Sequence, residues 1–291
     1  MNELPVITPS YQADARVFEQ LHRSVLEFTP ESTVHHVFVP MQDRHLFTQY
    51  EGARCRIWTS SELLSARYLG LPETNRHPNA SRPRPSVGGW VIQQAIKIAA
   101  AAQFDAEVVL LADSDVVLVR PVRADRFRSE GRLNLCRHEN SITPDTNHFR
   151  WHQIARDLLG LPQAPPPLHD YISPLNFWEP ATVRAMQARI KDVTGKAWLD
   201  AFTSEQTISE YILYGVFVDE ILSAAGPRPP GVWGVSLNAH QRTPLDHDAA
   251  IAFANRLGPA AVAIMISARS DTPEEVRRTA IRRCTEIVKG L

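Results

Sequence analysis

Cysteine is scarce in this chain, and its residues are too far apart to form a known motif. Cys55, Cys136 and Cys284 make neither a C-x-x-C pair nor a spacing typical of zinc ligands. This excludes a disulfide-rich scaffold and a structural zinc site built on cysteine, and an odd count suits a reducing compartment. We expect all three to be small buried side chains.

The chain also lacks a long apolar run and an excess of charge of either sign. No apolar stretch approaches the ~20 residues that a membrane-spanning helix requires, and the N-terminus lacks the features of a signal peptide. The 31 basic and 32 acidic side chains leave a net charge of -1, which argues against a general nucleic-acid-binding protein. We therefore expect a cytoplasmic protein with no transmembrane segment and no nucleic-acid partner.

What the chain does have is an alternation of apolar strands and helices over its first 120 residues. Strands are predicted at residues 4–8, 34–39, 54–59 and 108–112, with helices between them. This order is typical of an α/β fold, with a mostly parallel sheet that has helices on both faces. Such sheets bind ligands at the carboxyl ends of their strands, where Thr8–Tyr11, Asp43 and Asp113–Asp115 should gather.

The remaining segments carry weaker patterns. Further helices are predicted over residues 180–193, 204–224 and 246–257, and further strands over residues 132–136, 171–178, 231–239 and 260–266. The last helix has Thr272 as its predicted N-cap and Pro273 at its first helical position. Two Pro-rich stretches are predicted to be irregular, the basic segment 72–89 and the polar segment between residues 136 and 171.

The most informative stretch is VVLLADSDVVLVRPV, from Val108 to Val122. Asp113 and Asp115 interrupt an apolar run that otherwise looks buried, and two buried carboxylates require a cation or dense hydrogen bonding. Three interpretations are open: a polar turn, a HAD-type phosphatase with Asp113 as nucleophile, and a metal-dependent glycosyltransferase. The phosphatase also needs a downstream acidic pair, and none stands at a suitable strand end. Oxygen ligands suit Mn²⁺ or Mg²⁺, which would neutralise charge on a leaving diphosphate.

Together with this acidic stretch, several further segments occur in the same order along the chain as in glycosyltransferases of the GT-A fold, which the chain resembles. More narrowly, the chain resembles a bacterial GT-A-like family of unknown function, over roughly residues 4 to 240. The matching segments are Thr8-Pro-Ser-Tyr11 with Asp14, Val39-Pro-Met-Gln-Asp43, Gly89-Trp90 with Gln93, Gln94 and Lys97, Asp113-Ser-Asp115 with Arg120-Pro121, and Ser209-Glu-Tyr211 with Leu213-Tyr-Gly215. A Pro-rich insert at residues 162–167 departs from the family pattern, so the resemblance does not extend to the acceptor-binding site.

The resemblance implies a role for each matching segment. Base and ribose binding would fall to Thr8, Pro9, Ser10, Tyr11 and Asp43. The other predicted donor-binding residues are Arg84, Trp90, Gln94, Lys97, Asp113 and Ser114, among which Lys97 or Arg84 could pair with the diphosphate. The metal, Mn²⁺ or Mg²⁺, would be held by Asp113, Asp115 and a histidine, for which His240 is the first choice and His247 the second.

Glu210 is the candidate general base, with Glu205 as a substitute. Its place among aromatic residues on a helix would raise its pKa, as a base acting on an acceptor hydroxyl requires. Asp113 is the second candidate catalytic residue. If the transfer retains configuration, no such base is needed and Glu210 would only position substrate.

These residues together predict one GT-A-like catalytic domain over residues 1–291, with a nucleotide-binding half (1–121) and an acceptor half (122–291). The predicted function is metal-dependent transfer of a sugar from a nucleoside-diphosphate sugar to a carbohydrate or small-molecule acceptor. A GT-A-like nucleotidyltransferase is an alternative, although Thr8–Tyr11 lacks its glycine-rich basic loop. A non-catalytic nucleotide-sugar-binding module is another, disfavoured because both aspartates are present.

Overall fold

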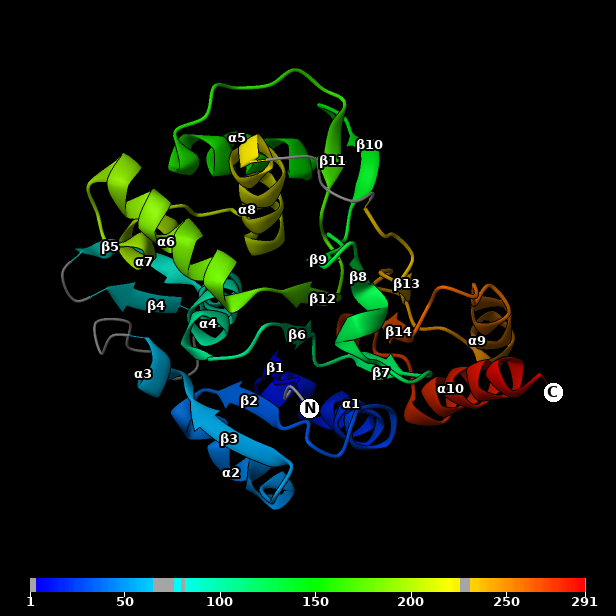
Figure 1. The fold of residues 1–291 in the computed structure, drawn as a ribbon. Coiled ribbons are helices and arrows are strands. Elements are labelled where there is room, and N and C mark those ends of the chain that lie inside the picture. The colour runs from blue at the N-terminus through cyan, green and yellow to red at the C-terminus, as the bar shows by residue number, and fades with distance from the viewer. Residues whose placement is uncertain (1–3, 65–75, 80–81, 226–230, 291) are drawn as a thin grey trace.

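The computed structural model describes residues 4–64, 76–79, 82–225 and 231–290, and its main feature is a five-stranded sheet. The strands lie in the order β12-β6-β1-β2-β3 (Figure 1). They are β1 (Val6–Pro9), β2 (His35–Val39), β3 (Cys55–Thr59), β6 (Val109–Ala112) and β12 (Leu175–Trp178). All neighbours pair in parallel except β12, which runs antiparallel to β6. The predicted α/β fold with a mostly parallel sheet is therefore confirmed.

Both faces of this sheet are covered over most of its width, which explains why its strands are mainly apolar. Ile7 and Leu111 face one hydrophobic core together with α4 (Gly89–Gln103). Val6 and Leu110 face the opposite core together with α1 (Ala15–Phe28). Successive side chains of a strand point to opposite faces, so a strand covered on both faces is apolar at most positions. The exception is the edge strand β3, where Arg56 is exposed.

A second sheet begins where the chain leaves the first. β7 (Val116–Leu118) starts directly after Asp115 and pairs with β14 (Ala263–Ile266), which in turn pairs with β13 (Ser236–Ala239). Helices α9 (His247–Ala254) and α10 (Glu274–Lys289) pack on one another and on this sheet (Figure 1). The second apolar run of VVLLADSDVVLVRPV is thus a strand of another sheet, and the aspartates occupy the crossing between the two.

The other elements cover the first sheet and extend beyond it (Figure 1). Helix α6 packs on α4, and α5 packs on α8. Their bounds, with those of the short helices, are α2 (Arg44–Phe47), α3 (Ser60–Leu63), α5 (Asn147–Leu159), α6 (Pro180–Thr194), α7 (Trp198–Phe202) and α8 (Glu210–Val216). Three antiparallel strand pairs remain among the described residues: β4 (Arg76–Asn79) with β5 (Arg82–Gly88), β8 (Arg128–Ser129) with β9 (Arg132–Leu133), and β10 (His138–Ile142) with β11 (Leu168–Asp170), between which α5 lies in the chain.

Two helix predictions were wrong at their N-terminal ends. The helix predicted over residues 204–224 begins only at Glu210, where Ser209 is the N-cap, and it passes into a π-helical turn at Phe217–Ile221. The last helix begins at Glu274, so Pro273 precedes it. Thr272 does not cap that helix, because its hydroxyl accepts a hydrogen bond from the backbone N–H of Leu245.

Both stretches predicted to be irregular contain regular structure. The β4–β5 hairpin lies within residues 72–89, and α5 lies between residues 136 and 171. Helix α5 follows Thr146 and ends at Gly160, whose positive φ of 66° suits glycine. Several later strands are shorter than predicted; the one expected over residues 231–239 is β13, Ser236–Ala239. All three cysteines are buried and free, as expected. Among the described helices, none is long and apolar enough to cross a membrane.

Candidate functional site

A cavity of about 650 Å³ opens at the carboxyl ends of β1 and β6. Residues from distant segments, predicted separately from the sequence, line it together. They are Pro9, Tyr11, Trp90, Gln94, Lys97, Asp113, Ser114, Asp115, Glu210 and His240. The expected gathering of side chains at the strand ends is therefore present in the fold, whereas the role of each side chain stays a prediction.

Three other predicted residues are buried behind this surface. The Thr8 hydroxyl is hydrogen-bonded to His35 Nε2 at 2.9 Å, and Ser10 Oγ lies 3.0 Å from Ser114 Oγ. Asp43 accepts a hydrogen bond from the backbone N–H of Gln12 at 2.9 Å, which ties the end of β2 to the turn after β1. They support the lining and do not form it. Arg84 lies on β5, but its side chain is outside the described part of the structure.

Lys97 is the buried centre of the cavity wall. Its Nζ lies 2.6 Å from Asp113 Oδ1, 2.9 Å from Glu210 Oε1 and 2.9 Å from the Tyr211 hydroxyl. Burial by itself would lower the pKa of Lys97, but Asp113 and Glu210 outweigh that effect and hold the pKa well above its usual range. Lys97 is therefore a charged group that joins the acidic turn to the start of α8.

Glu210 is more tightly held than a free base would be. Its side chain is buried against Lys97, and its backbone N–H donates to Gln94 Oε1 at 2.9 Å. Burial raises the pKa of Glu210, and the ion pair with Lys97 opposes that rise. The Lys97 ion pair offers another reason for a buried carboxylate at this position. The role of Glu210 as a general base therefore stays a prediction.

The opposite side of the acidic turn holds an excess of negative charge. Burial and the repulsion of neighbouring aspartates raise the pKa of Asp14 to about 7 and that of Asp115 to about 6. Asp115 Oδ2 accepts a hydrogen bond from the backbone N–H of Ala268 at 2.8 Å, and Arg269 lines the same cavity. Arg277 holds that loop through the carbonyls of residues 266, 267 and 272.

The acidic turn has the donor chemistry that Mn²⁺ or Mg²⁺ takes. Asp113 and Asp115 both line the cavity, and burial together with the neighbouring charge of Asp113 raises the pKa of Asp115 to about 6. Within the described residues, no three His, Cys, Asp or Glu side chains form a ready-made metal centre. Mg²⁺ is usually held by one or two carboxylates together with substrate phosphates and water. The pair therefore fits a cation that binds with a diphosphate, and His240 as a third ligand stays a prediction.

The structure adds cavity residues for which the sequence analysis assigned no role. Asp14 belongs to the segment that carries the resemblance, but its chemistry was not recognised. The others come from segments without a motif: His148, Trp151, Asp170, Trp233 and Arg269. No local signal in the sequence marks these side chains. His148 and Trp151 lie on α5, which was not predicted, and Trp233 and Arg269 lie in loops that the tertiary fold brings to the cavity.

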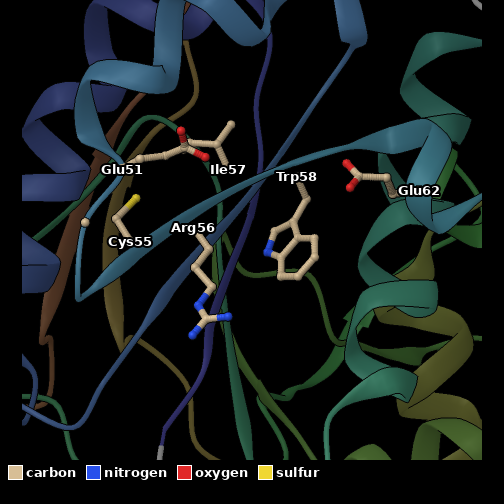
Figure 2. Close-up of a pocket in the computed structure, with 7 residues that line it drawn as sticks. Glu51, Cys55, Arg56, Ile57, Trp58 and Glu62 are labelled. Carbon is tan, nitrogen blue, oxygen red and sulfur yellow. The ribbon is translucent and has the colours of Figure 1, made fainter.

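A second hollow of about 390 Å³ lies along the edge strand β3 (Figure 2). Its acidic residues already have partners: Glu62 accepts from the Thr59 hydroxyl at 2.6 Å, and Glu51 pairs with Arg44 at 2.8 Å. Burial raises the pKa of the Cys55 thiol to about 12, so that side chain is not a nucleophile at neutral pH. The catalytic candidates therefore belong to the larger cavity.

A family model described as a family of unknown function (DUF6492) matches residues 4–224. Among solved structures, an active-site mutant of LgtC is 13% identical with a TM-score of 0.49, over 99% of this chain and 96% of that one. The galactosyltransferase LgtC in complex with donor and acceptor sugar analogues is 11% identical with a TM-score of 0.45, over the same shares. No curated protein matches the sequence. The cavity must therefore be interpreted from this chain's own residues.

Proposed function

The chain belongs to the DUF6492 family of unknown function, and we propose that it is a metal-dependent glycosyltransferase with a GT-A-like fold. Its donor would be a nucleoside-diphosphate sugar and its acceptor a hydroxyl of a carbohydrate or small molecule. One observation carries this proposal: the acidic turn after β6, the turn after β1, one face of α4 and the start of α8 line a single cavity. An acidic turn at the carboxyl end of a parallel sheet is where a diphosphate with its cation would bind.

Asp113 and Asp115 would hold the cation, which supplies neutralisation of the charge that develops on the departing diphosphate. Lys97 is a second positive charge at the same place, only 2.6 Å from Asp113. Pro9 and Tyr11 line the end of β1, where the nucleoside would lie, and Asp43 would act from behind by fixing the Gln12 backbone. Because Lys97 is held on two sides, it stays oriented without reorganisation when the donor binds.

The test is a thermal-shift assay of the wild type with UDP, GDP, CDP and TDP, with and without Mn²⁺. A nucleotide that binds the folded state raises the melting temperature by mass action. We expect one nucleotide to produce a shift that requires Mn²⁺. The absence of a metal-dependent shift with all four nucleotides would contradict the proposal.

Asp115→Asn assigns the metal dependence to the acidic turn. The amide keeps an acceptor for the Ala268 N–H but removes the charge, so the Mn²⁺-dependent shift should disappear while the fold is kept. Asp105→Asn is a matched control, because Asp105 is exposed and lies before the N-terminal end of β6, away from the acidic turn. Full metal dependence in Asp115→Asn would rule out that residue as a ligand.

A further inference from the structure

His148 and Asp170 form a hydrogen-bonded pair in the wall of the cavity, although the proposed donor site does not use them. His148 lies in the first turn of α5, and Asp170 is the last residue of β11. The Nδ1 atom of His148 is 3.0 Å from Asp170 Oδ2. The other carboxylate oxygen of Asp170 accepts the backbone N–H of Ile172 at 2.9 Å, which fixes the orientation of the carboxylate.

This pairing determines which ring nitrogen of His148 carries the proton. A carboxylate can only accept, so Nδ1 must be the donor and the lone pair of the neutral ring must lie on Nε2. Trp151 stacks on the imidazole with ring centroids 4.7 Å apart and an interplanar angle of 19°. The histidine side chain is 35% exposed, so the ring is held on one face and one edge but remains accessible.

The pair lies on the side of the cavity that also carries its exposed aromatic surface. His148 and Asp170 line the same cavity as His240 and as Asp113 of the acidic turn. Trp90 and Trp233 line the same cavity and are 37% and 43% exposed. Exposed indole faces in a polar cavity suit the apolar face of a sugar ring.

Building on the proposed function, we propose that His148, oriented by Asp170, is the general base that activates the acceptor hydroxyl. Its Nε2 takes the hydroxyl proton while the acceptor oxygen forms a bond to the anomeric carbon of the donor sugar. The bond from that carbon to the diphosphate oxygen breaks, and its electron pair leaves with the nucleoside diphosphate. The imidazolium, stabilised by the Asp170 carboxylate, then returns its proton to solvent. A single displacement of this kind inverts the anomeric configuration, and Glu210 is left as the counter-ion of Lys97.

Hydrolysis of the donor tests this assignment without knowledge of the natural acceptor, because water then takes the place of the acceptor hydroxyl. The probes are UDP-glucose, UDP-galactose, UDP-N-acetylglucosamine and GDP-mannose with Mn²⁺, and the donor that the wild type turns over fastest is used for the variants. We expect kcat of His148→Gln to fall by at least about 100-fold, with little change in the donor KM or in the nucleotide thermal shift. Asp170→Asn should also lower kcat, because it removes the charge that stabilises the imidazolium.

Two further measurements separate a chemical role from a structural one. Added imidazole should restore part of the turnover of His148→Gly, and the sugar released by the wild type should have inverted configuration. His45→Gln is the matched control, since His45 is exposed and its Nδ1 is hydrogen-bonded to the backbone carbonyl of Gln42. Unchanged kcat in His148→Gln, or a product of retained configuration, would overturn the base assignment alone. Failure of the wild type to bind any nucleotide or turn over any donor would overturn the proposed function and this assignment with it.

Discussion

The two walls of the cavity are built in different ways. The first wall consists of the turns after β1 and β6, which lie next to one another because those strands are paired in parallel. The second wall combines the start of α5, the end of β11, the start of α8 and the loop that carries Trp233. Parallel pairing brings the residues of the first wall together automatically, whereas those of the second wall meet only after several helices have packed.

Lys97 is the residue that joins the walls. It comes from α4, pairs with Asp113 in the first wall and pairs with Glu210 in the second. A single buried cation therefore links the two walls, beside the hydrogen bond from the Glu210 backbone N–H to Gln94 Oε1. Three changes test how far each wall can be disturbed separately.

The largest effect is expected from Lys97→Met. Removal of this cation leaves Glu210 buried without its partner, and breaking a buried ion pair in this way lowers the free energy of unfolding by about 3–5 kcal/mol. Urea unfolding of the wild type and the variant measures the change. The double variant Lys97→Met/Glu210→Met should regain much of the loss, because the buried charge of Glu210 is then absent and the remaining carboxylate, Asp113, is 37% exposed. If the free energy of unfolding of Lys97→Met lies within about 0.5 kcal/mol of the wild-type value, the ion pair does not stabilise the contact between the walls.

A smaller effect, confined to the second wall, is expected from Gly215→Ala. A Cβ at this position would lie 2.1 Å from Cγ of Tyr171, which is buried and donates a hydrogen bond to Asp219 at 2.8 Å. Overpacking of this kind typically lowers the free energy of unfolding by about 1–3 kcal/mol. Gly258→Ala is the control, because no atom lies within 4 Å of its added Cβ. Equal melting temperatures for the two variants would mean that α8 can move away from Tyr171 without loss.

The smallest effect concerns pH and the sheet beneath the first wall. Burial lowers the pKa of His36 to about 4, whereas the unfolded value is about 6.5. Between these values the unfolded chain binds more protons, so the free energy of unfolding must fall as pH falls. For this residue we expect a loss of roughly 1 kcal/mol between pH 6.5 and 5.5.

His36→Gln should remove that part of the pH dependence, since glutamine can still accept the hydrogen bond from Trp58 Nε1 but does not titrate. Urea unfolding at a series of pH values measures it, with His45→Gln as the control. Burial also lowers the pKa of His152 on α5 to about 4, so the His36→Gln variant should keep the part of the pH dependence that comes from His152. Identical slopes for His36→Gln and the wild type would contradict the assignment.

The contrast between the walls also explains which sequence-based predictions succeeded. The four parallel strands of the main sheet were predicted within about two residues, because burial on both faces leaves a mainly apolar run in the sequence. The fifth strand, predicted over residues 171–178, begins only at Leu175. The start of α8 was misplaced because residues 204–209 have a helical pattern, and only the cap at Ser209 shows where the helix begins. Helix α5 was missed because His148 and Trp151 lie among polar residues in a segment flanked by prolines.

By itself, the sequence determined the α/β class, the parallel strands and the location of an acidic turn at their carboxyl ends. It could do so because strand burial and strand-end polarity are local patterns along the chain. Only the tertiary structure decided that Lys97 lies between Asp113 and Glu210, and that His148 meets Asp170 in the same cavity. Those contacts join residues 16, 113 and 22 positions apart, and each depends on how helices and hairpins pack, which no local pattern records.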